Sequence, residues 1–213
     1  MDTQTLPAAE PSSLLRAVET LRAGSLVAFP TDTVYGLGAR AWDEGAVAQL
    51  YVAKGRAETK AIPLLLASVD ALREIVVGFP SVALALAARF WPGPLTLVLY
   101  RRARVPDVVT GGGPTVAVRV PDHPVALRLI AALGEPLAAT SANLSGAPSP
   151  VTAEEVAAQL GGRIPLILDG GPCPGGLAST VLDLTVSPPV ILRRGPVRPE
   201  DLRALVPDVV ERD

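Results

Sequence analysis

The 213-residue chain is poor in two side chains that often carry catalysis. Cysteine occurs once, as Cys173, and histidine once, as His123. One cysteine excludes a disulfide framework and a thiolate metal cage, and no paired His or Cys spacing indicates zinc or iron. A Ser-His-Asp or Cys-His enzyme would need His123, whose place before Pro124 is more typical of a helix cap. Cys173 lies in GGPCPGG without basic neighbours, so we interpret it as an unreactive loop thiol.

Aromatic residues and long apolar runs are also scarce. Aromatics make up 4% of the chain, too few for the base-stacking platforms of single-stranded RNA readers. No apolar run approaches the ~20 residues of a membrane span, and MDTQTLPAAEPSS lacks the features of a signal peptide. The net charge of −2 gives no overall attraction to nucleic acid. We therefore expect a cytoplasmic protein with small-molecule chemistry, no membrane contact and RNA contact only through a local basic patch.

Lysine is unusually placed. Of the 19 basic residues only Lys54 and Lys60 are lysines, and in KGRAETK they flank Arg56. Two point charges beside a guanidinium fork suggest an anion site. A charged helix end closed by Gly55 explains the same residues, and composition alone does not separate the two interpretations.

With 49% hydrophobic residues the chain can build a real core, and we expect one domain over 1–213, with a core at about 13–195 and a short helical tail at 196–213. Periodicity and caps at Ser12 or Ser13, Asp43 and Thr152 predict helices at 13–22, 44–53, 69–76, 81–90, 124–133 and 153–160, with a short one after Pro199. Apolar, β-branched runs predict strands at 25–30, 63–67, 95–100, 115–120, 136–140, 164–168, 180–184 and 189–193. This interleaving predicts an α/β fold with a mostly buried sheet of mixed direction.

Polar side chains follow several predicted strands, which is where open α/β sheets usually place ligands. They are Thr31-Asp32-Thr33, Arg119, Thr140-Ser141-Ala142-Asn143, Ser179-Thr180 and Arg193-Arg194. We expect these groups to meet in one cleft. The stretch FPTDTVYGLG is interpreted as a strand end followed by a turn that lets amides and hydroxyls approach a ligand.

Two nucleotide-binding fingerprints are weak or missing. GLGARA at 36–41 fits the loose form GxGxxA, with Glu58 downstream for a ribose contact. TDTVY separates its first glycine from the preceding strand, and the helix cap comes later, at Asp43, so we do not favour a dinucleotide fold. GxxxxGK[ST] is absent, so a nucleotide would be bound by another device.

The remaining candidates are cations and small hydroxyl or amide groups: Lys54, Arg56, Lys60, Arg119, Arg193, Thr33, Thr115, Ser141, Asn143, Ser149 and Ser179. No nucleophile or general base stands out. The set suits a reaction whose substrates supply nucleophile and leaving group while the protein aligns them and neutralises charge. Attack of a carboxylate-like oxygen on the α-phosphate of ATP, expelling pyrophosphate, is such a reaction. Taken singly, each residue is more typical of a cap or turn.

The order of seven motifs resembles the YrdC-like family, the threonylcarbamoyl-AMP synthases. The motifs are PTDTVYGLG, KGRAETK, WPGPLTLVL, TVAVRVPDHP, TSANLSGAPSP, STVLDL and ILRRG, spanning about 25–195. The resemblance implies an open α/β fold with a twisted sheet around a concave, positively charged cavity. It implies that L-threonine, bicarbonate and ATP, carrying Mg²⁺, form threonylcarbamoyl-AMP and pyrophosphate. The product would pass to a tRNA threonylcarbamoyltransferase complex that modifies tRNA beside the anticodon.

The resemblance also implies roles for individual residues. The expected catalytic, nucleotide-handling core is Lys54, Arg56, Ser141 and Asn143. Further expected ATP contacts are Lys60, Thr115, Ser149 and Arg193. The expected threonine pocket is Thr33, Arg119, Ala139 and Ser179, with Arg119 as the fork for the amino-acid carboxylate. Phosphate oxygens, rather than a protein cage, are expected to hold the metal.

The chain departs from the family pattern in two ways. Ala57 and Ala61 stand where relatives often carry proline, so the loop after Arg56 is expected to be less stiff. The chain stops soon after ILRRG, as in the short single-domain form, so its own loops or a partner would close the cavity.

Two rival functions stay open on the sequence. One is a module that binds double-stranded RNA or tRNA without catalysis, which the acidic balance and few aromatics disfavour. The other is a related carbamoyl-adenylate enzyme of hydrogenase maturation, a system that includes zinc fingers, which one cysteine cannot supply.

Overall fold

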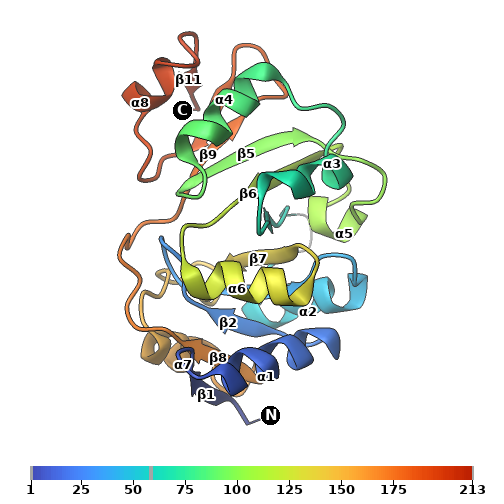
Figure 1. The fold of residues 1–213 in the computed structure, drawn as a ribbon, viewed down its shortest axis with the longest axis vertical. Helices are drawn as coiled ribbons and strands as arrows, with labels where there is room; N and C mark the ends of the chain where they lie inside the picture. The colour runs from blue at the N-terminus through green and yellow to red at the C-terminus, as the bar shows by residue number, and fades with distance from the viewer. Residues whose placement is uncertain (1, 58–59, 213) are drawn as a thin grey trace.

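The computed structural model describes residues 2–57 and 60–212, and within them the strands form one mixed sheet (Figure 1). The strands are β1 (Gln4–Pro7), β2 (Val27–Phe29), β3 (Gly36–Arg40), β4 (Leu64–Leu65), β5 (Leu95–Tyr100), β6 (Thr115–Arg119), β7 (Leu137–Ser141), β8 (Leu166–Asp169), β9 (Thr180–Asp183), β10 (Val190–Arg193) and β11 (Val210–Glu211). Their spatial order is β1-β8-β2-β3-β7-β4-β6-β5-β9-β10-β11. β5 is antiparallel to β6 and parallel to β9, so the predicted mixed α/β sheet is confirmed.

The helices are α1 (Pro11–Arg22), α2 (Glu44–Lys54), α3 (Leu72–Ile75), α4 (Ser81–Phe90), α5 (Asp107–Thr110), α6 (Pro124–Leu133), α7 (Ala153–Leu160) and α8 (Pro199–Arg203), with a 3₁₀ turn at Val69–Ala71. α1 and α6 lie side by side across β2 and β8 (Figure 1). Leu21 of α1, Leu129 of α6 and Phe29 of β2 are fully buried in the core that they share. Burying apolar faces of this kind is the main stabilising contribution to the fold.

Most of the predicted helix ends are confirmed. Asp43 accepts a hydrogen bond from Ala46 N at 3.0 Å, and Gly55 ends α2 in the left-handed region at φ 59°. His123 Nδ1 accepts from Val125 N at 3.2 Å, so the lone histidine caps α6. The predicted cap at Ser12 or Ser13 is wrong, because α1 already begins at Pro11, whose fixed φ suits a first helical position.

Residues 30–35 turn away from the end of β2 as predicted, but residues 36–40, which the predicted turn included, form β3, antiparallel to β2. The ring of Phe29 lies over its glycines, and a Cβ at Gly38 would meet Phe29 Cε1 at 2.8 Å. The glycines therefore admit an aromatic ring, and no helix opens inside GLGARA as a dinucleotide fold requires. Glu58, the ribose contact of that alternative, lies outside the described residues.

The short elements were the hardest to predict. β1, α5 and β11 were not predicted, and 69–76 divides into a 3₁₀ turn and α3. The tail at 196–213 is not wholly helical, because Val210–Glu211 pairs with β10 after α8. In residues 2–57 and 60–212 no helix combines the length and the apolar character required to cross a bilayer.

β4 joins two groups of strands and thereby positions the cavity described below. The first strand group, β1, β8, β2, β3 and β7, lies on one side of β4, and the second strand group, β6, β5, β9, β10 and β11, on the other. In Figure 1, the labelled strands β1, β8, β2 and β7 lie in the lower half of the view and β6, β5, β9 and β11 in the upper half. β4 pairs with β7 and β6 through only two residues, Leu64 and Leu65. Residues on either side of this narrow joint can therefore face a common space.

Candidate active site

A cavity of about 330 Å³ receives side chains from both strand groups. β3 and β7 contribute Gly36, Ala139 and Ser141, and β6 contributes Ala117 and Arg119. Successive side chains on a strand point to opposite faces, so Ala117 and Arg119 share a face, as do Ala139 and Ser141. The remaining lining residues include Thr31, Thr33, Tyr35, Arg56, Ala61, Pro63, Thr96, Thr140, Ala178, Ser179, Val181, Leu192 and Arg193.

Arg119 crosses from the second strand group to the β2–β3 loop. Its side chain forms an ion pair with Asp32, and Nη1 donates to Thr33 Oγ1 at 3.1 Å. Nε donates to Gly93 O at 2.9 Å, which fixes the plane of the guanidinium. An arginine has five N–H donors, so two remain for a ligand after these three contacts.

Arg193 and Ser179 form a second polar cluster on the cavity wall. Arg193 Nε donates to Ser179 O at 3.0 Å, and Nη2 donates to Ser179 Oγ at 3.0 Å. The register of β10 shifts between Ile191 and Arg193. Such a bulge interrupts strand alternation, which explains why the neighbours Leu192 and Arg193 both line the cavity.

Arg56 approaches the cavity from the segment after α2. Its Nη1 donates to Thr140 Oγ1 at 3.1 Å and its Nη2 to Ala61 O at 3.0 Å. Nε of Arg56 is buried and has no hydrogen-bond partner within the described residues. A buried donor without a partner is unusual in a folded protein.

Three arginines line the cavity: Arg56, Arg119 and Arg193. No Asp, Glu or Lys is found among the described residues that line it, and Asp32 is paired with Arg119. Burial lowers the pKa of the Arg193 guanidinium, and the charges of Arg119 and Arg56 add to this shift. Burial also lowers the pKa of Arg119, an effect that Asp32 opposes. Guanidinium groups stay protonated, so the cavity is suited to an anionic ligand.

The hydroxyls of the β2–β3 loop organise the loop itself. Thr31 Oγ1 donates to Val34 O at 2.7 Å and accepts from Thr33 N at 3.1 Å. The loop packs closely against a second loop, because a Cβ at Gly175 would lie 2.5 Å from Asp32 O. Gly176 N also donates to Thr33 O at 2.9 Å. Small polar residues therefore fold the loop tightly and bring Thr33 to the cavity.

The structure brings together most of the polar groups expected to converge. The predicted site residues that line the cavity are Thr33, Arg56, Arg119, Ala139, Ser141, Ser179 and Arg193. Those that do not line it are Lys54, Lys60, Thr115, Asn143 and Ser149. Thr115 lies on the same face of β6, one step beyond Ala117, whereas Lys60 is exposed. Arg194 does not line the cavity, and it pairs with Glu211.

Sequence reasoning missed the groups that orient the arginines. Asp32 and Thr140 stood in the strand-end clusters, but neither was assigned a role in the site. Asp32 orients Arg119, and Thr140 accepts from Arg56. Gly93 O accepts from Arg119 Nε, and a backbone carbonyl of this kind leaves no signal in the sequence.

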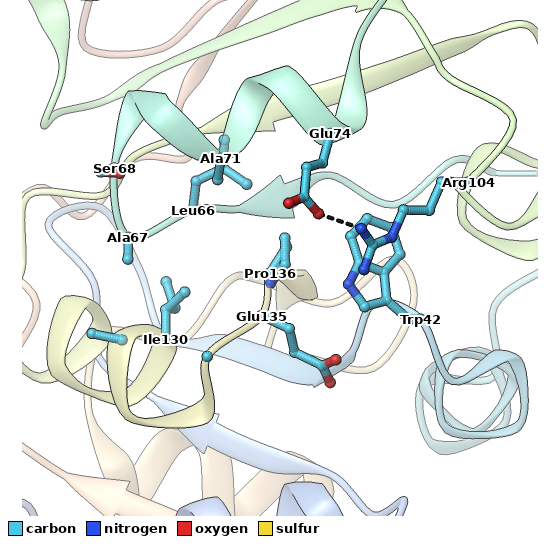
Figure 2. A pocket seen from close by; sticks show the side chains of 12 residues that line it. Trp42, Leu66, Ala67, Ser68, Ala71, Glu74, Arg104, Ile130, Glu135 and Pro136 are labelled. Atoms are coloured by element: carbon cyan, nitrogen blue, oxygen red, sulfur yellow. Dashed lines mark hydrogen bonds and ion pairs between the residues drawn. The ribbon is translucent and has the colours of Figure 1, made fainter.

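A second cavity, of about 360 Å³, contains none of the predicted site residues (Figure 2). Glu74 pairs with Arg104 there, and the Arg104 guanidinium lies 4.9 Å from the centre of the Trp42 ring. Glu135, also on its wall, pairs with Arg40. Because its charges are paired, this cavity is less suited than the arginine-lined cavity to an anionic ligand.

Comparison with known proteins agrees with the fold, a mixed α/β protein whose two strand groups both line one cavity. A family model, Sua5_yciO_yrdC, described as telomere recombination, matches residues 19–195. The chain belongs to this Sua5/YciO/YrdC family. It is 49% identical over 189 residues to the threonylcarbamoyl-AMP synthase of Pyrococcus abyssi, covering 89% of this chain and 56% of that protein.

Two further comparisons extend over most of the chain. It is 47% identical over 197 residues to the threonylcarbamoyl-AMP synthase of Bacillus subtilis, covering 91% of this chain and 56% of that protein. The crystal structure of P. abyssi Sua5 complexed with L-threonine superposes with a TM-score of 0.94 at 45% identity, covering 99% of this chain and 62% of that one. The chain thus spans 56% of the length of both curated relatives.

Proposed function

We propose that the protein is an L-threonylcarbamoyladenylate synthase, which converts L-threonine, bicarbonate and ATP into threonylcarbamoyl-AMP and pyrophosphate. The single observation that carries this proposal is the meeting of Arg56, Arg119 and Arg193 on one cavity. Both a triphosphate and an amino-acid carboxylate are anionic, and arginine forks suit both groups. The names of the relatives and the threonine complex of P. abyssi Sua5 support the same choice of substrates.

The threonine carboxylate is assigned to Arg119. Three of its donors are already used by Asp32, Thr33 and Gly93, which leaves one N–H on each terminal nitrogen. Because the guanidinium is held on three sides, it binds the carboxylate in one orientation. Thr33, Ala139 and Ser179 complete the proposed pocket around the amino acid.

The nucleotide is assigned to the part of the cavity bounded by Arg56, Ser141 and Arg193. Arg56 and Arg193 both line this part of the cavity, and their positive charges attract phosphate oxygens. Lys60, Thr115 and Ser149 are retained as outer ATP contacts in this proposal, because a triphosphate and adenosine extend beyond the cavity wall.

The chemistry needs no protein nucleophile. The threonine amine adds to the carbon of bicarbonate with loss of water and gives an N-carboxylate. An oxygen of that carboxylate attacks the α-phosphorus of ATP, the bond to the β-phosphate oxygen breaks, and pyrophosphate leaves with the electron pair. The arginines align the reactants and stabilise the charge that develops on the phosphates.

Mg²⁺ would enter with ATP as part of the substrate. No group of three or more His, Cys, Asp or Glu within residues 2–57 and 60–212 is arranged to hold a metal. The residues therefore suit an ion held mainly by phosphate oxygens and water, which would neutralise phosphate charge. We also propose that the reaction takes place in the cytoplasm and that its product passes to a tRNA threonylcarbamoyltransferase complex.

Pyrophosphate release tests the proposal. The protein is mixed with ATP, Mg²⁺, bicarbonate and each amino acid in turn, and pyrophosphate is measured. Threonine should give a signal that disappears when bicarbonate is omitted. Salt-dependent binding of tRNA or double-stranded RNA without threonine-dependent pyrophosphate would contradict the proposal and favour an RNA-binding module.

A further inference from the structure

Lys54 does not reach the cavity. It is the last residue of α2, its exposed fraction is 3%, and its side chain is absent from the described lining. Arg56, two residues later, does line the cavity. The two cations of this segment therefore lie in different surroundings.

The Lys54 ammonium is surrounded by acceptors from one turn of the chain. Nζ donates to the backbone oxygen of Ser141 and to Asn143 O at 2.5 Å. It also lies 3.3 Å from Asn143 Oδ1. A lysine ammonium has three N–H donors, so these acceptors leave none for a substrate.

The same turn is fixed from its other side. Asn143 Nδ2 donates to Leu144 O at 2.8 Å and to Ala147 O at 2.7 Å. Ser145 N donates to the backbone oxygen of Lys54 at 2.9 Å, and Leu144 N donates to Gln159 Oε1 at 3.1 Å. Lys54 and Asn143 are thus the central pair of a network that holds the segment 141–147.

The charge of Lys54 has no carboxylate partner among the described residues. Arg56 is the charged side chain that acts on it, and the groups facing it from the 141–147 segment are carbonyl and amide groups. Burial lowers the pKa of Lys54 to about 8, and the charge of Arg56 adds to this shift. A buried cation held only by carbonyls is costly, which favours a role beyond stability.

We propose that Lys54 is a positioning residue: its ammonium holds the backbone of Ser141 and Asn143 so that the Ser141 side chain faces the cavity, and Lys54 itself does not contact substrate. This differs from a role in which the ammonium binds the triphosphate. The identity of the ligand that Ser141 faces, ATP, rests on the proposed function. The inference that Lys54 restrains the turn at 141–147 does not depend on it.

Amide hydrogen exchange of the protein without substrates tests the restraint. Lys54→Met should speed exchange within 142–147 by about tenfold or more, because the opened turn exposes these amides. Lys54→Arg should do the same, since a planar guanidinium cannot place its donors where the ammonium has them. Lys60→Met, a change at the exposed lysine of the same segment, is the control and should leave exchange in 142–147 unchanged. If Lys54→Met fails to fold, the exchange rates within 142–147 in Lys54→Arg test the restraint on their own.

Nucleotide binding by calorimetry separates positioning from phosphate contact. Lys54→Met should weaken the binding of ATP and the binding of AMP by similar factors, because the change displaces the turn at Ser141 and removes no contact to the β- and γ-phosphates. If the Lys54 ammonium contacted the triphosphate directly, the loss of ATP affinity would be about tenfold greater than the loss of AMP affinity. That result would overturn the proposal. Unchanged exchange in both Lys54 variants would also overturn it. If the wild type gives no threonine-dependent pyrophosphate, the proposed function fails while the exchange result still decides the role of Lys54.

Discussion

Arg119 on β6 and Asp32 in the β2–β3 loop form an ion pair that joins the two strand groups beside the cavity. Their side chains are 6% and 11% exposed, so the pair is almost fully removed from water. Two further N–H donors of Arg119 have no partner among the described residues. The contact therefore both connects the halves of the sheet and orients the group assigned to the amino-acid carboxylate.

Arg119→Met should abolish threonine-dependent turnover and lower the free energy of unfolding. The second effect arises because the buried Asp32 carboxylate would lose its cationic partner and keep only the hydrogen bond from Asp122 N, and removing one member of a buried ion pair typically costs ~3–5 kcal/mol. Denaturant unfolding and pyrophosphate release measure the two effects.

The paired variant Asp32→Leu/Arg119→Met separates stability from function. Replacing both members of a buried ion pair by apolar side chains is often close to neutral for stability. The double variant should regain most of the lost unfolding free energy but none of the threonine-dependent turnover. Recovery of turnover would show that Arg119 acts only on the fold.

Arg193→Gln should raise the KM for ATP more than the KM for threonine. A hydrogen bond to a charged group contributes ~1.5–3 kcal/mol, so an increase of roughly tenfold or more is expected. Initial rates at varied ATP and at varied threonine measure the two constants. A larger rise in the KM for threonine would instead assign Arg193 to the amino-acid pocket, whose Ser179 accepts a hydrogen bond from it.

Gly38→Ala should lower the free energy of unfolding by ~1–3 kcal/mol, the usual effect of overpacking. The new Cβ would lie 2.8 Å from Phe29 Cε1. Adding Phe29→Leu should recover part of the loss, because the smaller side chain makes room. Denaturant unfolding of the wild type, the single variant and the double variant measures these changes. An unchanged free energy of unfolding in Gly38→Ala would show that the contact with Phe29 does not require a glycine.

Turnover should fall as pH rises through the Lys54 pKa of about 8. The neutral amine has two N–H donors for three acceptors, which would loosen the turn at Ser141. A fall of roughly tenfold between about pH 7 and pH 9 follows if only the charged form positions the turn. In Lys54→Arg, whose guanidinium keeps its proton, this alkaline fall should be absent from any residual activity.

Unfolding measurements over the same pH range provide a control. Because folding lowers the pKa of Lys54, the unfolded chain binds more protons between about pH 8 and the ordinary lysine value. Lys54 therefore makes the free energy of unfolding rise with pH in this range. A parallel loss of activity and stability near pH 8 would point to unfolding rather than to the turn.

The sequence predicted the mixed α/β fold and the convergence of polar groups, because apolar runs and strand-end hydroxyls are local signals. Asp43 and His123 as caps could be predicted for the same reason. β3 could not, because its Gly-Leu-Gly start has low strand propensity, and the ring of Phe29 from the neighbouring strand determines its packing.

Side-chain direction was the main limit for the site. Lys54 and Arg56 stand two residues apart, and the left-handed turn at Gly55 separates a buried ammonium from a cavity-lining guanidinium. The bulge that brings Leu192 beside Arg193 depends on pairing with β9, which lies outside local sequence. The assignment of one domain over 1–213, the metal and the partner complex stay predictions.

The central claim is that amino acid and nucleotide occupy one cavity between the two strand groups. A crystal structure with L-threonine and a non-hydrolysable ATP analogue tests it most directly. We predict the threonine carboxylate on the free donors of Arg119 and the triphosphate along Arg56 and Arg193. Threonine and nucleotide bound at separate places, or either of them bound in the cavity beside Trp42, would contradict the account.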